Sequence, residues 1–183
     1  MKFKTFTLAA SIAVIATTVA AHKGATGVLL ERMQAMLAMG KATKAVAPMM
    51  RGQIDYDADQ TRAYAAVLQT HSGEAMLALF PNGLNAKPSV AKDNVWTDWE
   101  EFSDLANDLA MYAAALDLAS ENGLGEAVPA VDSLMGGDTV DLMGGAVEVE
   151  QTAQTLASLP VNTLFAQSAQ VCSACHSKFR EEE

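Results

Sequence analysis

Apolar side chains recur at spacings of three and four residues through four long segments of the chain, which is the period of an amphipathic α-helix. The segments run over about residues 27–50, 57–80, 94–121 and 159–176. Alternating β-branched residues, which would indicate strands, are almost absent. Helices with one apolar face bury that face by packing together, so the pattern predicts an all-α protein. We expect an antiparallel four-helix bundle with a ligand held between facing helices.

The helix ends carry their own signals. Asp57 and Gln60 have the spacing of an N-cap residue and its reciprocal partner, so we expect the second helix to begin there. The Pro-Asn-Gly turn at residues 81–83 ends it. Pro48 falls in the last turn of the first helix and should distort it or remove one backbone hydrogen bond. The face of the first helix that we expect to be buried consists of Leu29, Met33, Met36, Gly40, Thr43 and Ala47.

The connection between the third and fourth helices, residues 120–158, is long. Residues 123–145 are rich in glycine and contain Pro129, which predicts loops and one brief helix, and residues 146–156 return to a helical pattern. Pro160 suits the first turn of the last helix.

The N-terminal segment has the three parts of a secretory signal peptide. Lys2 and Lys4 give a positive start, residues 6–19 are apolar or small and uncharged, and Val-Ala-Ala at 19–21 fits a signal-peptidase site. We expect cleavage after this site, which leaves one domain over residues 22–183. A membrane anchor is the alternative, but the apolar run is short for a bilayer span and no basic cluster follows it. In a Gram-negative bacterium the mature chain would be periplasmic.

The composition is acidic. The chain has 12 Lys plus Arg and 22 Asp plus Glu, a formal net charge of −10. Loss of the two leader lysines leaves 10 basic residues against 22 acidic ones, or −12. Such a chain is not expected to bind nucleic acid. Half of the residues are apolar, so a mature chain of about 160 residues can bury a substantial core.

The pentapeptide Cys-Ser-Ala-Cys-His at residues 172–176 has the C-x-x-C-H pattern of covalent c-type haem attachment. Two thiols at this spacing can each add to a vinyl group of the porphyrin, and the adjoining imidazole is then held beneath the iron as an axial ligand. The pattern therefore predicts one haem c, attached through Cys172 and Cys175, with His176 on the iron.

The same pentapeptide has three alternative interpretations. A thioredoxin-type dithiol normally follows a strand, and no strand is expected here. A structural zinc site needs four ligands in most cases, and the other histidines, His22 and His71, show no ligand-pair spacing. A disulfide between helical residues three apart has poor geometry and would leave His176 unexplained.

Several segments resemble one known family. The ending from the haem pattern through Phe179 and Arg180 is similar to the C-x-x-C-H-x-x-[Y/F]-R terminus of the cytochromes c′, the class II c-type cytochromes. Arg32-x-x-x-Met36 resembles part of that family's first-helix pattern. Residues 95–102, Val-Trp-Thr-Asp-Trp-Glu-Glu-Phe, resemble its I-W-x-D-x-x-x-F entry into the third helix. The resemblance covers most of 27–119 and 159–180, and the 120–158 connection is longer than the family's usual turn.

The resemblance implies roles for further residues. Arg32 would reach a haem propionate, and a surface ion pair with Glu31 is the alternative. Arg180 would lie one turn after His176 near the exposed proximal face, where it would bond a propionate or control access. A solvated charge in the tail is the alternative for Arg180. Core and haem-edge packing is expected for the aromatic residues Trp96, Trp99 and Phe102.

Met36 decides the iron chemistry that the resemblance implies, because it would lie across the iron from His176. Family members with a bulky apolar residue there hold five-coordinate, high-spin iron that admits NO and CO, and the overall pattern favours this form. A branch resembling cytochrome c556 uses methionine there as a sixth ligand to low-spin iron. An ordinary core methionine is the third alternative. His71, among polar residues, is expected at the surface rather than on the iron.

Two classes of function remain. The first is a haem protein that exchanges electrons with periplasmic redox partners or binds NO or CO, and it needs no catalytic residues. The second is an enzyme such as a haem peroxidase, which needs a distal acid–base group that Met36 cannot supply. We therefore expect a carrier and not an enzyme. The resemblance also implies a homodimer in which the first and second helices pair.

Overall fold

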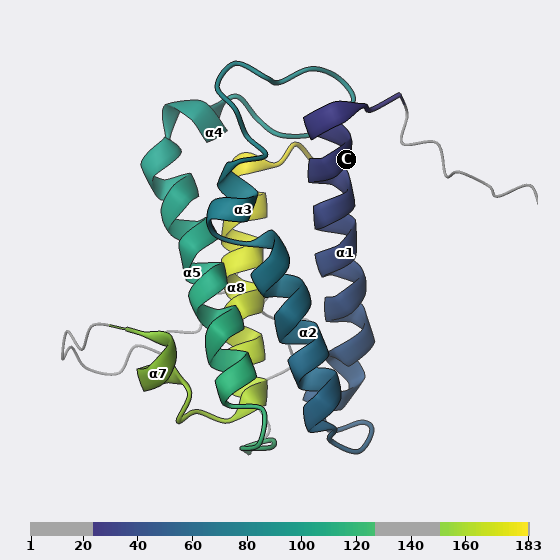
Figure 1. The fold of residues 1–183 in the computed structure, drawn as a ribbon, viewed down its shortest axis with the longest axis vertical. Helices are drawn as coiled ribbons and strands as arrows, with labels where there is room; N and C mark the ends of the chain where they lie inside the picture. The colour runs from purple at the N-terminus through teal and green to yellow at the C-terminus, as the bar shows by residue number, and fades with distance from the viewer. Residues whose placement is uncertain (1–23, 127–150, 183) are drawn as a thin grey trace, which may run out of the picture.

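The computed structural model describes residues 24–126 and 151–182. Four long helices form an antiparallel bundle (Figure 1): α1 (Gly27–Met50), α2 (Ala58–His71), α5 (Trp99–Leu118) and α8 (Val161–Phe179). Three single-turn helices complete the described part, namely α3 (Glu74–Leu77), α4 (Asn94–Thr97) and α7 (Ala153–Leu156). The predicted four-helix bundle is confirmed. The predicted leader and most of the long connection lie outside the described residues.

The helices do not pack equally. α5 packs closely against both α8 and α2, and α1 packs mainly against α2. α1 and α8 share few contacts, although they run antiparallel with the beginning of α1 at the same end of the bundle as the end of α8 (Figure 1). We call this the α8 end. The loop between α3 and α4 also lies there. None of the described helices is long and apolar enough to cross a membrane.

The buried face of α1 differs from the predicted one. Gly40, expected in that face, is exposed, and Met33 and Thr43 are only half-buried. The buried positions of α1 keep the helical period, but the face that α2 covers is rotated by about one residue from the predicted one. Pro48 stays within α1, which continues to Met50. The buried residues of α1 are Leu29, Arg32, Ala35, Met39, Val46, Met49 and Met50.

Asp57 caps the start of α2 as predicted, but the reciprocal bond from Gln60 to the Asp57 backbone is not formed. The Asp57 carboxylate accepts hydrogen bonds from the backbone N–H groups of Asp59 at 2.9 Å and Gln60 at 3.0 Å. The Gln60 side chain donates to the other carboxylate oxygen and not to the Asp57 backbone, whose N–H points to the sulfur of Met49. These bonds, with the Gln60 side chain first, lower the pKa of Asp57.

Two helices that the sequence pattern treats as continuous are interrupted. The second ends at His71, and the chain turns through Gly73, whose φ of 55° and ψ of −136° few other residues adopt. The Gly73 N–H donates to the Ala106 carbonyl of α5 at 2.9 Å. The third is divided at Asp98, between α4 and α5. The interruption at Gly73 is fixed by its bond to α5, which the pattern of a single helix does not contain.

Hydrogen bonds join the two ends of the connection between α5 and α8. In the predicted 146–156 helix, only α7 is helical within the described part, and a capping box between Thr152 and Thr155 starts it. The Asn122 side chain donates to the carbonyls of Ala157 at 2.8 Å and Leu159 at 3.0 Å. The two ends of the connection therefore meet at the start of α8.

Candidate haem-attachment site

The haem pattern lies in the last two turns of α8. Cys172 and Cys175 are free thiols, about one turn apart, and both are half-buried against the hydrophobic core. His176 follows on the same helix and is more exposed. Two free thiols at one helical turn beside an imidazole match the donor set that a c-type haem requires. These residues therefore fit the group that the sequence predicts.

The local environment sets the protonation of these groups. Burial raises the pKa of both Cys172 and Cys175 to about 11, so near neutral pH the thiols are protonated. Burial, and then the charge of Arg180, lower the pKa of His176. The neutral imidazole is the form with a lone pair for a metal. The site thus presents neutral ligands before any cofactor is attached.

The end of α8 is tied to the loop between α3 and α4. Lys92 N–H donates to the Phe179 carbonyl at 2.8 Å, and Glu181 N–H donates to the Val90 carbonyl at 2.7 Å. These bonds form an isolated antiparallel bridge between Ala91 and Arg180. Arg180 is exposed at this bridge, and its contact with a propionate remains a prediction.

An ion-pair cluster ties the same end of α8 to the start of α5. The Lys178 ammonium lies 3.1 Å from an Asp98 carboxylate oxygen and also pairs with Glu101. The Glu101 and Asp98 bonds raise the pKa of Lys178. Ion pairs between side chains this exposed contribute little to stability. The cluster therefore helps to orient the end of α8 but adds little to the free energy of unfolding.

An aromatic cluster joins α8 to α5 and to the segment after α3. Phe102 is 2% exposed and contacts Phe179 edge-to-face at 5.4 Å between ring centroids. Its ring is also 4.7 Å from that of Phe80, which contacts Trp96 at 6.4 Å. The structure thus brings together the predicted Trp96 and Phe102, and adds Phe80 and Phe179. Phe179 was visible in the sequence only as the aromatic position of the terminal motif.

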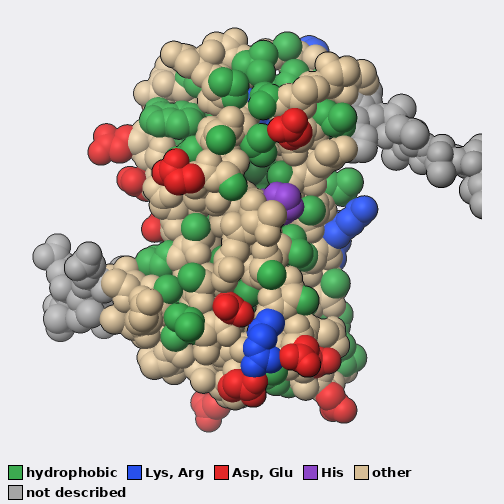
Figure 2. All heavy atoms as spheres, in the orientation of Figure 1, with side chains coloured by type: hydrophobic (Ala, Val, Ile, Leu, Met, Phe, Trp, Pro, Cys, Tyr) green, Lys and Arg blue, Asp and Glu red, His purple; other side chains and the backbone are tan. Residues whose placement is uncertain are grey.

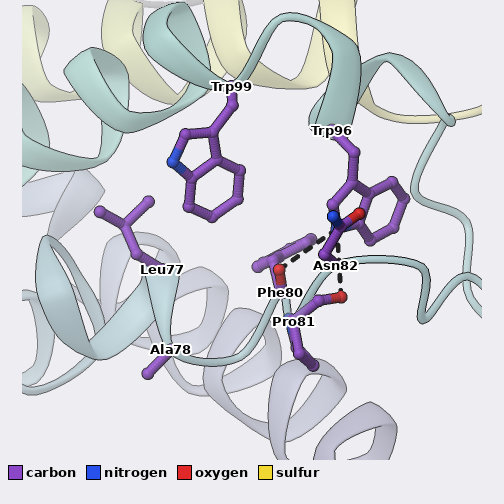
Figure 3. Close-up of a pocket in the computed structure, with 7 residues that line it drawn as sticks. All are labelled: Leu77, Ala78, Phe80, Pro81, Asn82, Trp96 and Trp99. Carbon is purple, nitrogen blue, oxygen red and sulfur yellow. Dashed lines mark hydrogen bonds between the residues drawn. The ribbon is translucent and has the colours of Figure 1, made fainter.

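Trp96 and Trp99 line a surface pocket on the outer side of this aromatic cluster (Figure 3). The pocket has a volume of about 410 Å³ and largely apolar walls. The Trp96 indole N–H donates to the carbonyls of Phe80 and Pro81, both at 3.2 Å. Trp99 is 38% exposed. Trp96 therefore packs against the core as predicted, and Trp99 lies at its rim. Several hydrophobic side chains gather over α3 and α4, whereas acidic ones are scattered over the visible face (Figure 2).

Arg32 is buried, with 5% of its surface exposed. Its Nε and Nη2 donate to the Leu79 carbonyl at 3.1 and 2.8 Å, and its Nη1 donates to Ser89 Oγ at 3.2 Å. The guanidinium lies over the Phe80 ring, 3.8 Å from its centroid. The alternative of a surface ion pair with Glu31 is wrong, because Arg32 points into the protein. Burial lowers the pKa of Arg32, yet arginine stays charged.

Met36 lies one turn after Arg32 on α1 and is half-buried against the core. It lies in the half of α1 that shares the α8 end with His176 (Figure 1). His71, predicted at the surface, is half-buried at the last residue of α2. Met36 and the haem motif therefore lie toward the same end of the bundle, and the position of Met36 across the iron from His176 stays a prediction.

Comparison with known proteins decides the family. The profile of the family described as Cytochrome C' matches residues 28–137, more than half of the chain. The chain belongs to the cytochrome c′ family. Membership implies a covalently bound haem c. The haem pentapeptide lies beyond the matched range and supports the assignment independently.

Individual relatives agree with this assignment. The cytochrome c′ of Rhodopseudomonas palustris is 31% identical over 91 residues, which is 49% of this chain and 62% of that protein, less than two thirds of its length. Two solved structures of cytochrome c prime from Alcaligenes xylosoxidans have a similar fold. The recombinant native protein has a TM-score of 0.57 at 21% identity, and a ferrous variant 0.58 at 20%. Each match covers 85% of this chain and 94% of the other.

Proposed function

We propose that this chain is an exported, periplasmic c-type cytochrome that carries electrons and binds NO or CO at its haem iron. Cys172 and Cys175 hold one haem c covalently, and His176 is the axial ligand. The observation that carries the proposal is the pair of free, half-buried thiols one turn apart on α8, followed by an imidazole whose pKa is lowered. No catalytic residue is proposed, and peroxide turnover should stay at the level of free haem.

When bound, the haem supplies an iron that changes between ferrous and ferric states. Each protein group has a separate task. The thioether bonds from Cys172 and Cys175 keep the group in place, and the neutral His176 donates its lone pair. Arg32 is a buried cation that pairs with no carboxylate of the described residues, so a propionate near it would offset the cost of burying its charge. Arg180 is exposed at the end of α8.

The iron in this proposal is five-coordinate and high-spin, with an open position for a small gas. One solved relative supports it, because a nitric oxide complex is described for a variant of cytochrome c prime from Alcaligenes xylosoxidans. The ferric protein should then show high-spin optical and electron paramagnetic resonance spectra, and the ferrous protein should bind CO. A low-spin ferric spectrum with a methionine-to-iron charge-transfer band contradicts this form.

The alternative is a six-coordinate, low-spin protein of the cytochrome c556 kind, in which Met36 is the sixth ligand. The half-buried position of Met36 at the α8 end favours it. Met36→Leu separates the two, because leucine fills similar space without a donor atom. If Met36 ligates the iron, Met36→Leu converts low-spin to high-spin iron and lowers the reduction potential. If it does not, the spin state is unchanged.

A homodimer through α1 and α2 is part of the proposal. Leu37 on α1 is 49% exposed and Ile54, between α1 and α2, is 52% exposed. Large apolar side chains exposed on α1 and on the turn into α2 are suited to an interface. Leu37→Asp should therefore shift the sedimentation coefficient from dimer to monomer, and the exposed Leu118→Asp on α5 is the matched control. A monomeric wild-type protein contradicts the dimer.

A further inference from the structure

Arg32 has donors to spare. A guanidinium carries five N–H donors. Three of them are in use, one from each nitrogen, with two on the Leu79 carbonyl and one on Ser89 Oγ. One hydrogen on each terminal nitrogen is left over. Because Arg32 is 5% exposed and stacks on Phe80, bulk water reaches these hydrogens poorly.

Ser89 is saturated as an acceptor. Its Oγ accepts the Arg32 Nη1 hydrogen at 3.2 Å and the Ala91 backbone N–H at 3.1 Å. A hydroxyl has two acceptor lone pairs and one hydrogen to donate. With both lone pairs in use, the remaining capacity of Ser89 is its O–H hydrogen. No atom among residues 24–126 and 151–182 accepts it.

The position of Ser89 is fixed relative to the haem helix. The next residue along, Val90, accepts the Glu181 N–H, and Lys92 donates to the Phe179 carbonyl. Ser89 therefore lies between Arg32 of α1 and the end of α8. That helix ends at Phe179, three residues after His176. An acceptor that bonds both the Ser89 hydroxyl and the spare hydrogens of Arg32 must lie in this corner of the bundle.

We propose that Ser89 is a positioning residue that donates a hydrogen bond to the haem propionate that Arg32 binds. The two side chains form one carboxylate site, in which the bond from Arg32 to Ser89 Oγ turns the hydroxyl hydrogen outward. This inference rests on the proposed haem function. It assigns a residue that the sequence pattern did not single out.

The test uses the matured holoprotein with haem labelled with carbon-13 at its propionate carboxyls, followed by infrared titration with pH. Ser89→Ala should raise the apparent pKa of one propionate, with the acid dissociation constant falling about tenfold, because a hydrogen bond to the ionised form is lost. Ser89→Thr keeps the hydroxyl and should titrate like wild type. Ser103→Ala removes a hydroxyl that bonds within α5 and is the matched control.

Each outcome decides the matter. Hydrogen exchange over residues 84–93 reports whether the loop stays attached in each variant. A propionate pKa that is the same in Ser89→Ala and wild type overturns the inference. So does an equal shift in Ser89→Thr and Ser89→Ala, since that would reflect the loop and not the hydroxyl. A wild-type protein that carries no haem overturns the proposed function as well, whereas these two results overturn the Ser89 role alone.

Discussion

Gly73 lies in the turn between α2 and α3, and its substitution tests how that turn is held. It combines a φ of 55° and a ψ of −136° with a backbone hydrogen bond to Ala106 of α5. A Cβ at this position would lie 3.1 Å from the Ala110 Cβ. We predict that Gly73→Ala destabilises the protein, because the backbone must either keep a conformation that alanine disfavours or move away from α5.

The magnitude follows from opposing terms. Holding a residue with a side chain in this region of φ and ψ costs about 1–3 kcal/mol. Alanine also restricts the unfolded chain, which returns about 0.4–1 kcal/mol. The close contact with Ala110 adds to the cost, since the hydrogen bond to Ala106 limits how far the turn can shift. We expect a net loss of about 1–2 kcal/mol in the free energy of unfolding.

Urea denaturation followed by far-ultraviolet circular dichroism measures this loss as a lower midpoint at an unchanged slope. Ser72→Ala is the matched control at the neighbouring position. The Ser72 hydroxyl is buried without a hydrogen-bond partner, so its removal should be neutral or stabilising. A Gly73→Ala protein as stable as wild type would refute the reasoning about this turn.

Three further predictions concern the bundle. Phe102→Ala should lower the free energy of unfolding by about 3–5 kcal/mol, since the ring is buried between Phe80 and Phe179. Phe102→Leu should lose less in the same urea titration, and a loss below about 1 kcal/mol for alanine contradicts the cluster. Asp57→Ala should lower the urea midpoint near neutral pH. Because its folded pKa is depressed, the stabilisation by Asp57 is present above its unfolded pKa of about 4 and disappears as pH falls through the folded pKa. If wild type and Asp57→Ala still differ in urea midpoint below the folded pKa of Asp57, the result would contradict the cap. Burial raises the pKa of Tyr64 to about 12. In an absorbance titration, Tyr64→Phe should therefore lose a phenolate step near that pH and keep the steps near pH 10.

The features that the sequence predicts well are those that depend on neighbouring residues. The Asp57 cap is local, since it needs only bonds within a few positions. The haem pattern is local too, because three side chains on the last turns of one helix define it. These parts of the fold and site could be predicted from the residues alone.

The features that the sequence does not predict depend on distant partners. The interruption at Gly73 needs the Ala106 carbonyl of α5, and the buried face of α1 depends on where α2 lies. The acceptors that hold Arg32 in its buried position could not be predicted, because Leu79 and Ser89 are 47 and 57 residues away in the chain and only the fold brings them to α1.

Intact mass spectrometry of the purified protein, made in cells that mature c-type cytochromes, tests the central claim most directly. We predict a processed polypeptide heavier by one covalently bound haem, and the bare polypeptide mass for the variant with both Cys172→Ala and Cys175→Ala. A colourless wild-type protein with the mass of the bare chain would contradict the account.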